Sequence, residues 1–419
     1  MLILQKVFFG WNFFALFVCI EIKKCYNNRV RKTFGENFFM IEIKEVKTKK
    51  DMRLFASYPI KLYKDCPYYV PSLRSDELST FNPKKNFSLA ENDCKAFLAY
   101  KDGQLVGRIA GLINKTDNQI TGKKMIRFSR FECIDDIEVF KALLGAVEKY
   151  GKENGMEIIH GPWGFNDTDR EGMLTFGFDR RSTYATNYYY PYFCEHMQEL
   201  GFSDESKWIE RAFDFRGHDY NKIYSLAQRI YKRVEVVDVA RTMSVKQIIK
   251  RYGDKLFNTM NEAYAELDGY VPLEGKVIEN VLSQFATIAN LRYISILVDK
   301  DDDVAAFVIV LPSICNALIK SRGKLFPFGF LRVLRSIKKP KELEMALIGV
   351  KHKYKNTGIA AVLMSGVMKN IIEDGICNVE SNPTLVHNYA IQSQMERLQG
   401  EVIKHRQTYT KEIGSLIKE

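Results

Sequence analysis

The residue pattern best suited to chemistry lies between Val350 and Ala361. An apolar run, Glu344–Val350, leads into a turn, and Gly358 opens a stretch with helical periodicity. The N-terminus of a helix offers free backbone N–H groups and the positive end of its dipole, so it can hold a pyrophosphate. Gly358 allows the backbone to approach the anion closely, and the small Ala360 and Ala361 leave room for it. The pattern predicts an anion-binding turn.

Three lysines surround this turn, at positions 351, 353 and 355. Ammonium groups would add positive charge around a bound phosphate. A glycine start beside solvated lysines also occurs in ordinary strand–turn–helix units. The place of the turn in the order of predicted strands favours anion binding.

Two carboxylates are candidates for general-base chemistry. Glu344 begins the strand before the turn, and Glu380 ends the next predicted strand. A carboxylate can take a proton from an attacking amine through a water molecule. His352 is a further candidate, although it lies among the lysines. Each of the three could equally be a surface or strand-end group.

The segment Lys355–Ala360 resembles the coenzyme-binding motif of the GNAT superfamily of N-acetyltransferases, Arg/Gln-x-x-Gly-x-Gly/Ala, with lysine at the first place. The resemblance implies that backbone amides of this loop bind the pyrophosphate of acetyl-CoA or another acyl-CoA. It also implies that the preceding strand splays away from the next one and faces the pantetheine arm, and it implies no metal. The implied cofactor-binding residues are Ile348, Gly349, Val350, Lys355, Asn356, Thr357, Gly358, Ile359, Ala360 and Asn388.

The downstream segment Asn388–Gly400 resembles the last motif of the same family. Met395 stands where many members carry the tyrosine that protonates the leaving thiolate, and methionine has no proton to donate. Tyr389 is nearby, but its spacing places it on another face of the helix. The candidate catalytic residues are thus the two carboxylates Glu344 and Glu380, together with Tyr389.

The elements around these residues predict a mixed α+β protein. Strands are expected at Met40–Val46, Lys95–Tyr100, Leu105–Asn114, Met125–Cys133, Glu157–His160, Tyr293–Asp299, Ala305–Leu311, Glu344–Val350 and Ile376–Glu380. Helices are expected at Ile137–Asn154, Tyr192–Leu200, Lys222–Arg233, Val245–Tyr264 and Gly358–Asp374, with a final one at Thr384–Leu398.

Both halves follow the same order of elements, which suggests duplication. The expected fold is a pair of tandem acyl-CoA N-acyltransferase-like domains, each a mixed, mostly antiparallel sheet flanked by helices. We place an N-terminal extension at 1–39, a degenerate GNAT-like domain at 40–217 and a GNAT domain with the coenzyme loop at 218–419. The corresponding turn of the first half is acidic. Asp135, Asp136 and Glu138 suit a helix N-terminus as caps and would repel a pyrophosphate.

An aromatic run precedes the predicted boundary. Its members are Tyr184, Tyr188, Tyr189, Tyr190, Tyr192 and Phe193. These side chains could line an acceptor pocket between the halves, but aromatic residues dominate core packing, and we favour the core.

Residues 1–39 allow three interpretations. The apolar run 7–20 is shorter than the roughly 20 residues that span a bilayer. The segment is an over-extended start with translation beginning at Met40, a membrane anchor, or a packed helix. The protein is expected to be cytoplasmic, and membrane-associated only if residues 7–20 are a real anchor.

The net charge and the cysteine spacing restrict the partners and the metal sites that the protein could have. The net charge is +11, and the first 50 residues hold ten Lys or Arg against four Asp or Glu, so over half of the excess lies there. Nucleic acid is therefore an unlikely partner of the folded part. The eight cysteines have no zinc-ligand spacing.

Three functions remain open. The leading one is acyl-CoA-dependent transfer, most simply acetyl transfer, to a small-molecule or peptide amine. The alternatives are a non-catalytic acyl-CoA-binding or scaffold protein and an aminoacyl-tRNA-dependent peptidyl-type transferase, for which the basic segment around 320–341 could contact RNA.

Overall fold

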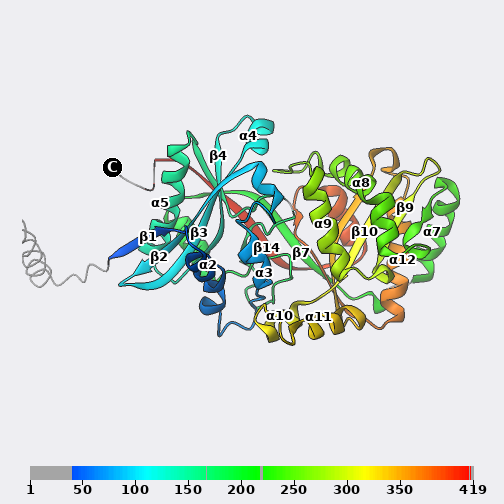
Figure 1. The fold of residues 1–419 in the computed structure, drawn as a ribbon. Helices are drawn as coiled ribbons and strands as arrows, with labels where there is room; N and C mark the ends of the chain where they lie inside the picture. The colour runs from blue at the N-terminus through cyan, green and yellow to red at the C-terminus, as the bar shows by residue number, and fades with distance from the viewer. Residues whose placement is uncertain (1–39, 167, 218–219, 415, 417–419) are drawn as a thin grey trace, which may run out of the picture.

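The computed structural model describes residues 40–166, 168–217, 220–414 and 416. The segment 1–39 lies outside these residues, so its three interpretations stay predictions. The chain forms two halves that lie side by side and share one sheet (Figure 1).

The first half packs helices on both faces of its strands. Alternate residues of β2 point to opposite faces, as the pleat requires. Phe97 and Ala99 join a core cluster with α5, whereas Leu98 packs with Phe55 of α2. The strands are β1 (Ile41–Glu45), β2 (Asn92–Lys101), β3 (Gln104–Asn114), β4 (Met125–Cys133), β5 (Ile158–Gly161), β6 (Met173–Phe176) and β7 (Ser203–Phe213). The helices are α2 (Lys49–Leu62), α3 (Arg74–Ser79), α4 (Lys115–Thr121), α5 (Ile137–Glu153) and α6 (Tyr192–Glu199).

The second half is built in the same way. Val308 of β10 packs with α7 and α12, and its neighbour Phe307 packs with α8 and α9. The strands are β8 (Val237–Asp238), β9 (Ile294–Val298), β10 (Val304–Pro312), β11 (Glu342–Val350), β12 (Asn378–Ser381), β13 (Thr384–Leu385) and β14 (Glu401–Glu412). The helices are α7 (Tyr220–Val234), α8 (Val245–Tyr264), α9 (Gly275–Ile288), α10 (Cys315–Ser321), α11 (Gly329–Lys338), α12 (Ile359–Glu373) and α13 (Tyr389–Arg397).

The two halves meet at β7 and β14. The strand order is β1-β2-β3-β4-β5-β14-β7-β12-β11-β10-β9-β8, so the last strand of the chain inserts between β5 and β7. β7 in turn pairs with β12 of the second half. The pairings are antiparallel except for β4 with β5 and β11 with β12. The mixed, mostly antiparallel sheet flanked by helices confirms the expected fold class.

Each half holds one parallel pair that separates after a few residues. β4 pairs with β5 from Met125 to Arg127, and β11 pairs with β12 from Glu342 to Met345. Both β4 and β11 then continue beyond their partners and lead to the helices α5 and α12. The shared geometry supports the duplication. The domain limits at 217 and 218 stay a prediction.

A buried ionic cluster ties β7 to β14. Glu210 of β7 accepts hydrogen bonds from Lys404 Nζ at 2.9 Å and from Arg406 Nε at 2.5 Å, and all three side chains are fully buried. Lys404 also donates to Glu380 of β12 at 2.8 Å. Three strands from both halves are thus joined by one largely buried group of charges.

Most predicted elements are confirmed, but the C-terminal end is corrected. The helix expected at Thr384–Leu398 begins at Tyr389, because Thr384 and Leu385 form β13 and Asn388 caps the helix. It is also not the final element, since β14 follows it. The strands β7 and β14 and the helices α2 and α9 were not predicted. Of the aromatic run, Tyr188, Tyr189 and Phe193 lie in the core.

The buried cluster gives a stability prediction. Glu210→Gln leaves two buried cations without their shared carboxylate, so we expect the free energy of unfolding in urea to fall by about 3–5 kcal/mol. Glu157→Gln is the matched control, because that carboxylate pairs with Lys124 at the surface. The control should unfold like the wild type. Equal unfolding of the Glu210→Gln variant and the wild type would contradict the role of the cluster.

Candidate functional site

The turn between β11 and α12 is shaped by Gly358. This glycine is the N-terminal cap of α12 and has a φ of +83°, which side-chain-bearing residues adopt at a cost. A Cβ atom there would lie 2.6 Å from Cδ1 of Ile230 on α7. The position therefore requires glycine both for its backbone conformation and for the close packing of α7 against α12.

The turn leaves a set of backbone donors unused. Within the described residues, the N–H groups of Asn356, Gly358 and Ala360 have no acceptor, whereas Thr357 N–H bonds to the carbonyl of Tyr354. The Thr357 hydroxyl also donates to that carbonyl, at 2.7 Å, and accepts from Ile359 N–H, which holds the turn closed. Alternating free donors at a helix N-terminus are suited to the oxygens of a pyrophosphate.

The three lysines of the turn differ in their surroundings. Lys353 pairs with Asp299 at 2.8 Å, and Lys351 pairs with Asp303. Lys355 is exposed, and no acidic partner is found for it in the described part of the chain. Of the three, Lys355 thus offers an uncompensated charge beside the free N–H groups.

Beyond Met345, β11 has left β12, and its backbone faces a cavity on that side. The hydroxyl of Tyr264, on α8, donates to the carbonyl of Ile348 at 2.9 Å and lies 3.4 Å from Ile348 N. The carbonyl of Ala346 still accepts from Asn382 Nδ2 at 3.3 Å, but over Leu347–Val350 no described strand pairs with this edge. Such an edge can pair with an extended amide-containing ligand, as a neighbouring strand would. In the structure, the Tyr264 hydroxyl occupies the hydrogen-bonding groups of Ile348 on this edge.

The turn, the splayed strand and α13 surround one cavity of about 1520 Å³ between the halves. This volume exceeds the roughly 300–1,000 Å³ of ordinary ligand sites, so there is room for more than one substrate. Met395 faces the cavity from α13 and is buried. The predicted cofactor residues in the wall are Ile348, Gly349, Val350, Lys355, Asn356, Gly358, Ile359, Ala360 and Asn388.

The cavity wall beside α11 is mostly apolar, and we call this part of the wall the apolar arm. It is formed by side chains of α9 and α11, among them Phe285, Ile288, Val333 and Ile337. The transfer of a hydrocarbon chain from water to such a surface lowers the free energy. The arm is therefore suited to an aliphatic chain.

Glu344 is the predicted base that the structure brings to the cavity. Its carboxylate is buried and accepts from Ser313 Oγ at 2.7 Å, Cys315 Sγ at 3.1 Å and Tyr184 N–H at 3.0 Å. Burial raises the pKa of Glu344 above its ordinary value, against the hydrogen bonds, which lower it. A raised pKa makes this carboxylate a better proton acceptor near neutral pH.

Other predicted residues lie elsewhere. Glu380 is bound to Lys404 in the ionic cluster and does not line the cavity. Tyr389 is 79% exposed on the outside of α13. Thr357 forms the turn without facing the cavity. Tyr264 was not predicted, because it comes from a helix far away in the sequence.

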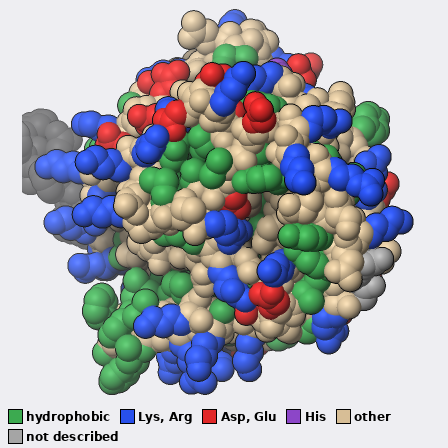
Figure 2. All heavy atoms as spheres, turned by 90° about the vertical axis from the view of Figure 1, so that its right-hand side faces the viewer, with side chains coloured by type: hydrophobic (Ala, Val, Ile, Leu, Met, Phe, Trp, Pro, Cys, Tyr) green, Lys and Arg blue, Asp and Glu red, His purple; other side chains and the backbone are tan. Residues whose placement is uncertain are grey.

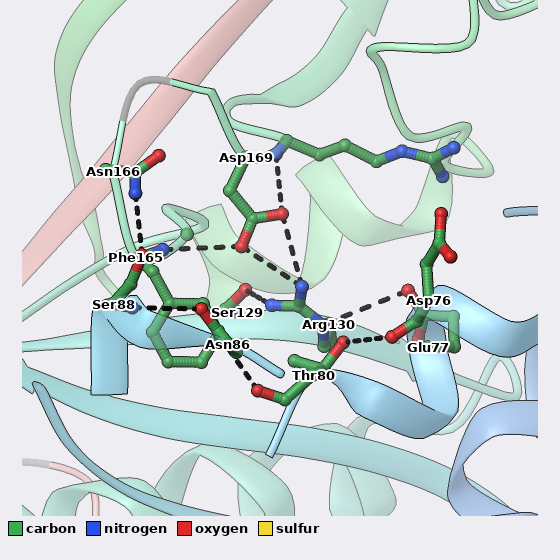
Figure 3. A network of polar contacts seen from close by, with 12 residues as sticks. Asp76, Glu77, Thr80, Asn86, Ser88, Ser129, Arg130, Phe165, Asn166 and Asp169 are labelled. Carbon is green, nitrogen blue, oxygen red and sulfur yellow. Dashed lines mark hydrogen bonds and ion pairs between the residues drawn. The ribbon is translucent and has the colours of Figure 1, made fainter. Parts of the chain in front are cut away.

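The wall contributed by the first half carries a charged network that sequence reasoning also missed (Figure 3). Arg130 of β4 donates to Asp169 at 3.0 Å and lies near Glu77 of α3, which also accepts from Arg108 at 2.9 Å. Although burial raises the pKa of Glu77, the two guanidinium groups lower it to about 2. These charges make one end of the cavity polar.

The splayed strand of the first half is covered by its own chain. Trp163 N–H donates to the carbonyl of Phe128, and Arg127 donates to the carbonyl of Gly164. Asp136 caps α5 by accepting from the N–H groups of Glu138 and Val139, as predicted. In the first half, the chain itself therefore covers the separated strand at Phe128, and a carboxylate lies at the N-terminus of the helix that follows.

Comparison with known proteins shows two similar sequences. No family model matches the sequence. Protein YghO of Escherichia coli (strain K12) is 27% identical over 383 residues, covering 87% of this chain and 94% of that protein. A bacterial ceramide synthase of Caulobacter vibrioides (strain NA1000 / CB15N) is 24% identical over 331 residues, covering 77% of this chain and 84% of that protein.

The solved structure of a tandem GNAT protein from the clavulanic acid biosynthesis pathway has a TM-score of 0.53 and 11% identity, covering 90% of this chain and 99% of that protein. The similarity extends over both halves. The chain therefore has the tandem GNAT fold.

The position of Tyr264 gives a binding prediction. Tyr264→Phe frees the backbone of Ile348, so we expect coenzyme A to bind about fivefold more tightly, as one hydrogen bond of about 1 kcal/mol would require. Calorimetry measures this. Tyr252→Phe is the control, because this tyrosine lies on the same helix outside the cavity and its hydroxyl donates to Asp302. Weaker binding by the Tyr264→Phe variant would show that the hydroxyl contacts the coenzyme instead of competing with it.

Proposed function

We propose that this protein is an N-acyltransferase that moves an acyl group from a coenzyme A thioester to a primary amine. The observation that carries the proposal is the open edge of β11, which leads directly to the free N–H groups of Asn356, Gly358 and Ala360. A pantetheine arm would pair with the strand edge, and the pyrophosphate would lie on the turn beside Lys355. The tandem GNAT fold supports this arrangement.

Transfer needs little covalent chemistry from the protein. The amine nitrogen attacks the thioester carbonyl, an N–C bond forms, and the C–S bond breaks to release the thiolate of coenzyme A. Glu344 accepts the proton of the amine through water. Met395 cannot protonate the thiolate. The thiolate then takes its proton from water that enters the cavity.

The cavity favours a long-chain substrate over a small polar one. Its apolar arm offers a wall for an aliphatic chain, and its volume is large enough for a coenzyme arm and an acceptor together. The relative named a ceramide synthase supports acylation of a lipid amine. We therefore propose a long-chain amine as the acceptor, with an acetyl or a longer acyl group on the coenzyme.

The charge of Lys355 gives a test of coenzyme binding. Lys355→Glu should weaken acyl-CoA binding about ten- to hundredfold, since a hydrogen bond to a charged group contributes about 1.5–3 kcal/mol. Lys246→Glu, an exposed residue of α8 outside the cavity, makes the same charge change and should bind like the wild type. Calorimetry with acetyl-CoA and palmitoyl-CoA measures both. If both variants bind acyl-CoA equally weakly, the loss of affinity comes from the change in net charge and not from a contact of Lys355 with the coenzyme.

The assignment of Glu344 gives a test of catalysis. The rate of thiol release with a long-chain amine should rise with pH as Glu344 ionises, with a midpoint above the usual value of about 4.3. Glu344→Gln should remove this dependence and lower kcat about 10²–10⁴-fold with KM little changed.

Glu342→Gln is the control, because that side chain lies on the same strand, pairs with Arg181 and is outside the cavity. Full activity of the Glu344→Gln variant would refute the assignment. Tight acyl-CoA binding by the wild type without turnover of any amine would favour the non-catalytic binding protein.

A further inference from the structure

The connection between β10 and β11 carries an unusual concentration of positive charge. Residues 313–341 contain eight Lys or Arg and no Asp or Glu. All eight are exposed, and none of them forms an ion pair with another described residue. We call residues 320–341 the basic segment; its cations are Lys320, Arg322, Lys324, Arg332, Arg335, Lys338, Lys339 and Lys341.

The same segment exposes large apolar side chains. Phe326 is 78% exposed, Phe328 66% and Leu331 52%. Phe330 and Leu334 are also exposed. Scattered single apolar residues are normal on a protein surface, but a contiguous group of this size marks an interaction site. Contact of these apolar side chains with water is unfavourable, so their grouping at one place indicates that a partner covers them.

The positive charge and the exposed apolar side chains both lie on α11 and on the residues that precede it. In α11, Phe330, Val333 and Ile337 line the cavity arm, so this face is used inside the protein. Arg332 and Arg335 are exposed outside the cavity, as is Leu331. Helices that combine basic residues with Phe and Leu lie in the plane of a membrane surface, with the apolar side chains among the lipids.

The arrangement in space supports a flat contact. α10 and α11 run along the lower edge of the molecule, below both halves (Figure 1). Figure 2 shows Lys and Arg side chains beside a protruding group of hydrophobic side chains at the lower edge of the molecule. No helix in the described ranges is long and apolar enough to cross a membrane.

We propose that the basic segment is a membrane-docking surface that binds anionic phospholipid bilayers. Phe326, Phe328 and Leu331 enter the interfacial region, and the surrounding cations bind the lipid phosphates. Nucleic acid would use the cations as well, but it gives no reason for the exposed leucine. The docking itself does not depend on acyl transfer.

Docking in this orientation has a consequence for the cavity. The inner face of α11 forms the apolar arm, and the outer face would lie on the bilayer, so one helix separates the lipid from the cavity. A long-chain substrate would then travel only the thickness of this helix from the bilayer to the site. The consequence rests on the proposed function, whereas the docking does not.

Flotation of the full chain with vesicles tests the docking without any substrate. We expect binding to vesicles of phosphatidylcholine with about 30% phosphatidylglycerol, and less binding as salt screens the charges. Replacing Phe326, Phe328 and Leu331 by serine should lower the partition coefficient about tenfold or more. Arg332→Glu with Arg335→Glu should act similarly. None of these five side chains lines the cavity.

Matched controls place equivalent changes elsewhere. Ile120→Ser with Val237→Ser removes exposed apolar side chains, and Lys246→Glu with Lys250→Glu reverses exposed charges. Both should bind vesicles like the wild type. In addition, the tryptophan fluorescence added by Phe328→Trp should be quenched by brominated lipids, whereas that added by Val237→Trp should not.

The outcomes separate the possibilities. Unchanged vesicle binding in both patch variants, or no quenching of the fluorescence added by Phe328→Trp, would overturn the proposal and assign any lipid binding to another part of the chain. A loss of transfer-RNA binding in the charge variant, with vesicle binding unchanged, would assign the segment to nucleic acid and also overturn it. An inactive but vesicle-binding protein would refute only the proposed acyl transfer.

Discussion

The pairing of β7 with both β14 and β12 is the constraint on which the rest of the structure depends. It joins two similar halves into one sheet, and the buried charges of Glu210, Lys404 and Arg406 make this register hard to exchange for another. The cavity follows from it, because the charged wall of the first half and the turn of the second half face each other only when the sheet is continuous. Glu380 binds Lys404 of the cluster, so of the two predicted carboxylate bases only Glu344 lines the cavity.

Both halves contain a parallel pair of strands that separates, and the two halves use it differently. In the second half, the separated strand β11 keeps an open edge and leads to a turn with free donors. In the first half, the chain that follows β5 bonds to the exposed backbone, and Asp136 occupies the helix N-terminus. The first half thus has its own loop and carboxylate at the places that correspond to the open edge and the turn, and it supplies one wall of the cavity.

The sequence predicted the elements whose apolar residues follow a clear period, as well as the turn at Gly358. The sequence did not predict the strands in which charged residues are buried. β7 and β14 contain Glu210, Lys404 and Arg406, which look like solvent-facing residues until a partner strand from a distant part of the chain neutralises them. For the same reason Tyr264 and the network of Arg130 could not be predicted: each contacts the cavity only through tertiary packing. The apolar arm likewise depends on the docking of α9 beside α11.

Hydrogen–deuterium exchange with and without a long-chain acyl-CoA tests whether β11 and the turn that follows it bind the coenzyme, because it reports backbone protection segment by segment. We expect the thioester to protect Ala346–Val350 and Asn356–Ala361, where the open strand edge and the free N–H groups lie. We expect no such protection at Phe128–Val139, the corresponding part of the first half. Protection confined to the first half, or no protection in the second half at saturating acyl-CoA, would contradict the claim that the splayed β11 and its turn form the coenzyme site.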